Sequence, residues 1–173
     1  MEIFTTIDID ASPETVWHVL TDFAAYEEWN PRTRISGTAA AGERLVVAPG
    51  PEAGRMPTFK PTLLQADPPR ELRWLGHLYV RGLFDGEHAF TIEDLGAGRA
   101  RLVQFETFSG VLARPLLRLF GEDTEQGFEA VNAALKARAE AMEAEPRVDT
   151  TDSPTVHVEG DGRSADSEIT VSG

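Results

Sequence analysis

The stretch Glu2–Pro31, EIFTTIDIDASPETVWHVLTDFAAYEEWNP, starts with the pattern of a strand and continues with that of helices. Odd-numbered positions from Ile3 to Ile9 form one face and acidic residues stand opposite, which is the period of a half-buried strand. Ser12 can cap a helix and Pro13 suits its first position. Helical structure must end before Pro31, because the residue preceding a proline avoids the helical region. This stretch therefore predicts one strand followed by two short helices.

Candidate strands fill the middle of the chain, and Gly and Pro clusters separate them. They are residues 34–38, 43–48, 57–66, 70–80, 87–95 and 99–109. The third of them contains Pro57 and Pro61. Proline cannot donate a hydrogen bond to a neighbouring strand, so this one is expected at the edge of a sheet or irregular.

A long helix is predicted next, because apolar residues recur there at helical spacing. They are Leu117, Phe120, Phe128, Val131, Leu135 and Met142, with Thr124 on the same stripe. Gly121 is expected to bend or interrupt this segment, with the longer helix opening at Glu122. Strands followed by a terminal helix predict the α+β class, with the helix packed on one face of the sheet.

The composition changes at the end of the chain. Residues 145–173 are rich in Ser, Thr, Asp, Gly and Pro, and carry more acidic than basic residues. They hold too little apolar surface to offset the entropy of ordering. We therefore expect a folded domain over residues 1–144 and an acidic disordered tail over 145–173, with short strands or a docking motif in that tail as a minor alternative.

Charge and composition exclude several classes of function. The net charge of −13 argues against nucleic acid and against an anionic membrane surface. The 173 residues contain no cysteine, no apolar run long enough for a membrane span and no signal-peptide pattern. We therefore expect a cytoplasmic protein without stable membrane insertion. No phosphate-binding loop and no metal-ligand spacing is present, so neither a cofactor nor a metal is expected.

Several short motifs resemble one superfamily. Residues 11–17, ASPETVW, with the blocks LTDF at 20–23 and YEEWNP at 26–31, resemble the opening of the START-like (SRPBCC) superfamily. The segments PPRELRW at 68–74, GEHAF at 86–90 and ETFSG at 106–110 are similar to its polyketide cyclase/dehydrase-like branch. The resemblance spans residues 2–143.

This resemblance implies a helix-grip fold. A curved antiparallel sheet of about six to seven strands would wrap around a long C-terminal helix, with two short helices after the first strand. A cavity would lie between sheet and helix. Members of the superfamily include lipid carriers, hormone receptors and aromatic polyketide cyclases, so the resemblance leaves the activity open.

The hairpin around residues 96–98 predicts how its two strands pair. A three-residue loop with Gly98 in the left-handed conformation sets the register. The expected pairs are Leu95 with Arg99, Ile92 with Leu102, Phe90 with Gln104 and His88 with Glu106. The face that carries the even-numbered residues is the more apolar one, so we expect it to point inward.

His88 and Glu106 would then be cross-strand neighbours on the cavity wall. They are a polar contact for a ligand carbonyl or hydroxyl, an acid–base pair for enolisation or dehydration, or a buried pair that satisfies its own hydrogen bonds and fixes the strand register. Gly127 either leaves space for a ligand or is a tolerated small residue. The candidate ligand-binding residues are Trp74, His88, Phe90, Gln104, Glu106, Phe108 and Phe128, with His88 and Glu106 as the catalytic candidates.

Three functions remain open. The leading hypothesis is binding or carriage of a small hydrophobic or aromatic molecule, lipid-like or polyketide-like, in an internal cavity. The alternative is a cyclase- or dehydratase-like enzyme that acts on a bound carbonyl compound. The second alternative is a protein-interaction module, for which the sequence indicates no particular partner.

Overall fold

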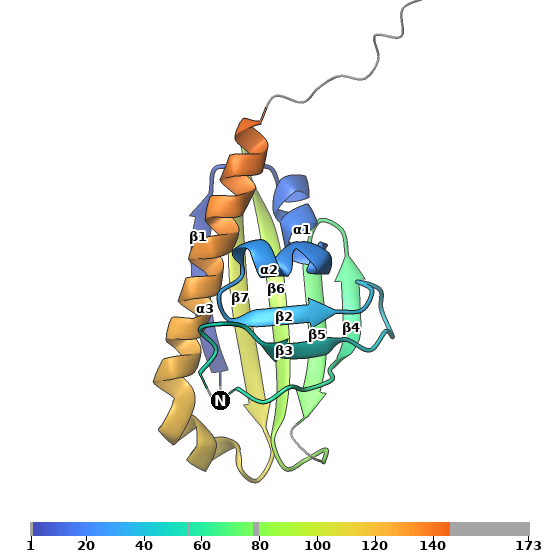
Figure 1. Cartoon of the computed structure of the whole chain (residues 1–173), viewed down its shortest axis with the longest axis vertical. Helices are drawn as coiled ribbons and strands as arrows, with labels where there is room; N and C mark the ends of the chain where they lie inside the picture. The colour runs from blue at the N-terminus through green and yellow to red at the C-terminus, as the bar shows by residue number, and fades with distance from the viewer. Residues whose placement is uncertain (1, 55, 78–79, 146–173) are drawn as a thin grey trace, which may run out of the picture.

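The structure is a computed structural model that describes residues 2–54, 56–77 and 80–145 (Figure 1). Within these ranges, seven strands, two short helices, one 3-10 turn and a long helix follow one another. They are β1 (Glu2–Ile9), α1 (Pro13–Thr21), η1 (Phe23–Ala25), α2 (Tyr26–Trp29), β2 (Thr33–Ser36), β3 (Val46–Pro49), β4 (Thr62–Asp67), β5 (Glu71–His77), β6 (Asp85–Gly96), β7 (Arg99–Ser109) and α3 (Ala113–Ala144).

The main sheet has five strands in the order β1-β7-β6-β5-β4, and every pairing in it is antiparallel. β2 and β3 form a separate two-stranded sheet. α3 lies lengthwise along the main sheet, and β2 and β3 cross in front of it (Figure 1). This arrangement confirms the predicted α+β class and the helix-grip fold, with the seven strands divided between two sheets.

The strands begin and end where the local sequence allows. β4 begins only after Pro61 and is one of the two edge strands of the main sheet, as the prolines predict. Phe59, in the segment before β4, forms an isolated bridge with Val47 of β3, and Thr62 at the start of β4 forms one with Arg44. Of the strand predicted at residues 70–80, β5 covers Glu71–His77, and residues 78–79 lie outside the described part of the chain.

The long helix differs from the prediction at its start. α3 is continuous from Ala113 to Ala144, so of the two alternatives expected at Gly121, a bend or an interruption, the interruption does not occur. One glycine inside a helix costs only about 1 kcal/mol relative to alanine, which the packing of so long a helix offsets. The first turns, yellow in Figure 1, nevertheless run at an angle to the rest. Of the predicted tail, residues 146–173 lie outside the described residues.

The C-terminal half of α3 is tied to the first strand by polar contacts. Lys136 Nζ donates to the backbone oxygen of Asp8 at 2.6 Å, and the backbone N–H of Asp10 donates to Glu140 at 2.9 Å. The hydrogen bond from Lys136, and then the one from Asp10, hold the pKa of Glu140 below its usual value. These contacts fix which residues of α3 face the sheet.

Candidate functional site

The β6–β7 hairpin closes through a tighter turn than the one predicted. Gly96 pairs with Arg99, and the two residues between them, Ala97 and Gly98, have positive φ angles of 54° and 70°. Leu95 becomes an extra residue in a bulge, so its predicted pairing with Arg99 is wrong. The bulge compensates for the shorter loop, which explains why the rest of the predicted register is preserved.

The remaining predicted pairs are all present. Ile92 lies opposite Leu102, Phe90 opposite Gln104 and His88 opposite Glu106. The even-numbered residues of the hairpin point inward, as predicted: His88 is 6% exposed and Gln104 is 2% exposed. A buried polar patch therefore occupies the middle of the inner face of the sheet.

Both nitrogens of the His88 ring have a hydrogen-bond partner. Nδ1 lies 3.3 Å from Glu106 Oε2, and Nε2 lies 3.1 Å from the amide nitrogen of Gln104. A carboxylate only accepts hydrogen bonds, so Nδ1 donates to Glu106. Nε2 of the neutral ring then accepts from Gln104, and this leaves the amide oxygen of Gln104 buried without a partner. The three side chains form one chain of hydrogen bonds.

Aromatic side chains surround the same ring. Trp74 on β5 stacks on His88, with 4.9 Å between ring centroids and 10° between planes. Phe90 lies 4.7 Å from His88, and Phe128 on α3 meets it edge-on at 4.9 Å. The structure thus brings together all the predicted site residues except one. Phe108 packs instead on Phe84 in a separate small cluster further along the hairpin.

Two buried polar residues next to this cluster were not among the predicted site residues. Asn132 on α3 is 2% exposed and donates from Nδ2 to Thr5 Oγ on β1 at 2.9 Å. Its amide oxygen is buried without a partner. Thr5 is the cross-strand neighbour of Gln104. The sequence did contain a signal for this contact: Asn132 is a polar residue four positions after Phe128, on the side of the helix predicted to face inward.

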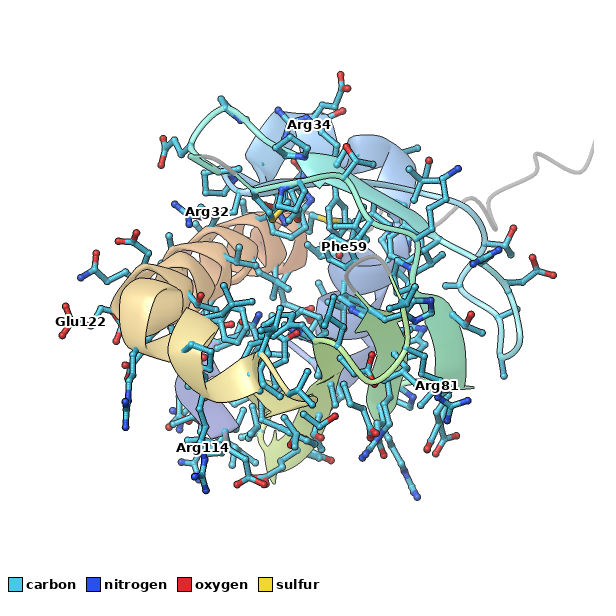
Figure 2. All side chains as sticks on the ribbon, turned by 90° about the horizontal axis from the view of Figure 1, so that it is seen from below. Arg32, Arg34, Phe59, Arg81, Arg114 and Glu122 are labelled. Carbon is cyan, nitrogen blue, oxygen red and sulfur yellow. The ribbon has the colours of Figure 1, made fainter. Side chains whose placement is uncertain are left out.

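Two glycines shape the surroundings of the site. A Cβ atom at Gly86 would overlap Glu106 Oε1, so only glycine leaves room for the carboxylate beside His88. At Gly127, a Cβ would lie 3.0 Å from the Arg32 guanidinium. Arg32, labelled beside α3 in Figure 2, therefore fills the space that was considered for a ligand.

Two hollows of the described surface lie away from His88. One, of about 660 Å³, lies on the outer face and is lined by residues that include Asp8 and Arg101. The other, of about 290 Å³, lies between β1 and α3, with Thr5 and Asn132 in its lining. In Figure 2, side chains from α3, the main sheet and the small sheet project into the space between them. The inner aromatic rings pack against one another.

Two further features concern metals and membranes. Within residues 2–54, 56–77 and 80–145, no group of three or more His, Cys, Asp or Glu side chains is placed to hold a metal ion. None of the helices in the same ranges is both long and apolar enough to cross a membrane.

The chain belongs to the family described as polyketide cyclase / dehydrase and lipid transport, whose model matches residues 2–140. A search of curated protein sequences found no significant match.

Solved structures agree with this assignment at the level of the fold. An aromatase/cyclase from a Streptomyces species is 20% identical with a TM-score of 0.64, covering 81% of this chain and 93% of its own. A START superfamily protein from Mycobacterium smegmatis is 20% identical with a TM-score of 0.60, covering 82% and 98%. A norcoclaurine synthase from Thalictrum, in complex with a transition-state analogue, is 13% identical with a TM-score of 0.64, covering 83% and 96%.

Proposed function

We propose that the protein binds a small hydrophobic or aromatic molecule between the β6–β7 hairpin and α3. The observation that carries this proposal is that hydrogen bonds and aromatic rings enclose the side chain of His88. Both its ring nitrogens are engaged, and Trp74 and Phe128 cover the ring, so it serves as part of a wall. Aromatic walls with a few fixed polar groups are typical of sites for small apolar ligands.

A ligand enters this site by displacing Phe128. The rings of the cluster contact one another, so one of them has to move to admit a guest. Trp74, His88 and Phe90 are buried and lie on paired strands, whereas Phe128 is only partly buried and lies on α3. Rotation of this one side chain opens the wall without breaking a strand pairing.

The test is native mass spectrometry of gently purified protein, with extraction and identification of any adduct. We expect a discrete apolar adduct at a ratio near one to one. Phe128→Ala is expected to raise the affinity by up to about fivefold, because a ligand no longer has to break the aromatic contact of Phe128 with His88, which is worth roughly 1 kcal/mol. The control is Phe4→Ala, since Phe4 is 60% exposed on the outer face. Absence of an adduct, together with absence of saturable binding of naphthol, contradicts the proposal.

The second candidate function is a cyclase- or dehydratase-like enzyme, and the Glu106–His88 hydrogen bond favours it. In an enzyme the base must reach its substrate, so Nε2 of His88 would have to exchange Gln104 for the bound carbonyl compound. His88→Ala and Glu106→Gln should then lower turnover about 100-fold or more. In a binding protein the same changes shift the affinity only modestly. Normal turnover in both variants excludes the catalytic assignment.

A further inference from the structure

The buried side-chain atoms that lack a partner are all oxygens. Within the described residues they are Oδ1 of Asp85, Oε1 of Gln104 and Oδ1 of Asn132. Asp85 opens β6 at an odd-numbered position, away from the inner face. The two amide oxygens belong to side chains that are each 2% exposed and lie between the sheet and α3.

Thr5 places these two amides beside each other. Thr5 is paired with Gln104 across β1 and β7, which puts their Cβ atoms about 5 Å apart. The hydroxyl of Thr5 also accepts the N–H of Asn132 at 2.9 Å. One unpartnered oxygen thus comes from the sheet and the other from the helix, on the two sides of the proposed ligand site.

The hydrogen bonds of His88 determine which atom of Gln104 is left over. The N–H at Nδ1 donates a hydrogen bond to Glu106, so in the neutral ring Nε2 carries no proton and accepts a hydrogen bond from Gln104. If the amide were reversed, its oxygen would face another acceptor. The oxygen of Gln104 therefore stays available for a donor from elsewhere.

An unpartnered buried acceptor is destabilising, by about 1–3 kcal/mol for each group. A ligand with a hydroxyl group removes this penalty, because its O–H donates to the amide oxygen. An ether or a ketone has no proton to donate. A carboxylate would also bring a negative charge close to Glu106.

We infer that the ligand is an uncharged apolar molecule with a hydroxyl group, and that its O–H donates to Gln104 Oε1 or to Asn132 Oδ1. The inference rests on the proposed binding function and narrows it to phenols and alcohols. Gln104 and Asn132 are then the residues that determine specificity.

The test compares three probes of nearly equal shape: naphthol, its methyl ether and the corresponding naphthoate. Their dissociation constants for the full chain are measured by equilibrium dialysis. We expect naphthol to bind at least about tenfold more tightly than the ether, since one buried hydrogen bond is worth roughly this factor. The naphthoate is expected to bind most weakly.

Substitutions connect this preference to particular residues. Gln104→Leu and Asn132→Leu remove one acceptor each, so the ratio between naphthol and ether should fall toward one in at least one of them. Ile92→Val, on the apolar part of β6, should leave the ratio unchanged. Circular dichroism and thermal unfolding of each variant confirm that it is folded.

The possible outcomes separate the two proposals. Binding of all three probes with equal affinity, or tighter binding of the ether, overturns the hydroxyl preference and leaves the binding function standing. Binding of none of them overturns both. A preference for naphthol that persists unchanged in both leucine variants contradicts the assignment to Gln104 and Asn132.

Discussion

The space between α3 and the main sheet has two halves that differ in what fills them. The apolar half consists of Ile9, Ile92, Leu102, Leu135 and Ala139. The polar half consists of Thr5, His88, Gln104, Glu106, Phe128 and Asn132.

Both halves are built by the same elements. On β7 the inward-facing residues change from apolar to polar between Leu102 and Gln104. On β1 the same change occurs at Thr5, which pairs with Gln104. In the apolar half every side chain is 5% exposed or less and needs no hydrogen bond. In the polar half two buried oxygens have no partner. Burial therefore has two different results here: in one half it holds the helix on the sheet, and in the other it leaves two acceptors without a partner, on which the proposed ligand site rests.

The largest effect is expected in the apolar half. Leu135 is 0% exposed, so Leu135→Ala should lower the free energy of unfolding by about 2–5 kcal/mol through lost burial and a residual cavity. Urea denaturation measures the change, with Glu122→Ala on the exposed face of α3 as the control. A loss below about 1 kcal/mol would show that this half does not anchor the helix.

A substitution at Gly86 tests how the polar half is organised. In Gly86→Ala the new methyl group displaces the Glu106 carboxylate, and His88 loses its acceptor without either residue being changed. We expect a loss of about 1–3 kcal/mol, as for a buried donor that is left without its partner. The Nδ1–H signal of His88 in NMR spectra should shift or broaden, and the signals of Leu135 should not. An unperturbed His88 signal would mean that the pair tolerates the methyl group.

Asn132 provides a matched contrast with Leu135, three residues further along the same helix. Both are almost completely buried, but Asn132→Ala removes one hydrogen bond and also one unpartnered oxygen. These two contributions oppose each other, so the stability should change by about 1 kcal/mol or less. If Asn132→Ala lowered the free energy of unfolding as much as Leu135→Ala, the two halves would not differ in their contribution to stability.

The smallest effect concerns the contact of α3 with β1. The pKa of Glu140 lies below its usual value of 4.5 because Lys136 and the Asp10 N–H bind the charged form. A lowered folded-state pKa stabilises the protein above the unfolded value, and this contribution is lost as pH falls through the folded value. Glu140→Gln should therefore lower stability at pH 7 by about 0.5 kcal/mol, the range of exposed ion pairs. In thermal unfolding, the stability difference between the wild-type protein and Glu140→Gln should decrease in acid. An equal difference at all pH values would contradict the assignment.

The sequence predicted the features that depend on local pattern. Alternation placed His88 and Glu106 on the inner face, and the glycines at residues 96–98 located the turn. The prolines before Thr62 correctly indicated an edge strand. Each of these patterns is local, because it lies within a few residues of the strand or turn that it predicts.

Other features depend on contacts between distant segments. The hydrogen bond between Thr5 and Asn132 joins residues that are 127 positions apart, and no local pattern indicates it. Phe108 is on the same face of the hairpin as His88, but its ring packs on Phe84 and belongs to another cluster. The bulge at Leu95 arose because a two-residue turn replaced the three-residue loop.

The most direct test of the central claim is an NMR titration of the full chain with naphthol. The account predicts saturable shifts in the ring signals of His88 and Phe128 and in the side-chain amide signals of Gln104 and Asn132. The methyl signals of Leu102 and Leu135 should change little. Saturable shifts in the apolar half or on the outer face around Phe4, with His88 and Gln104 unchanged, would contradict the account.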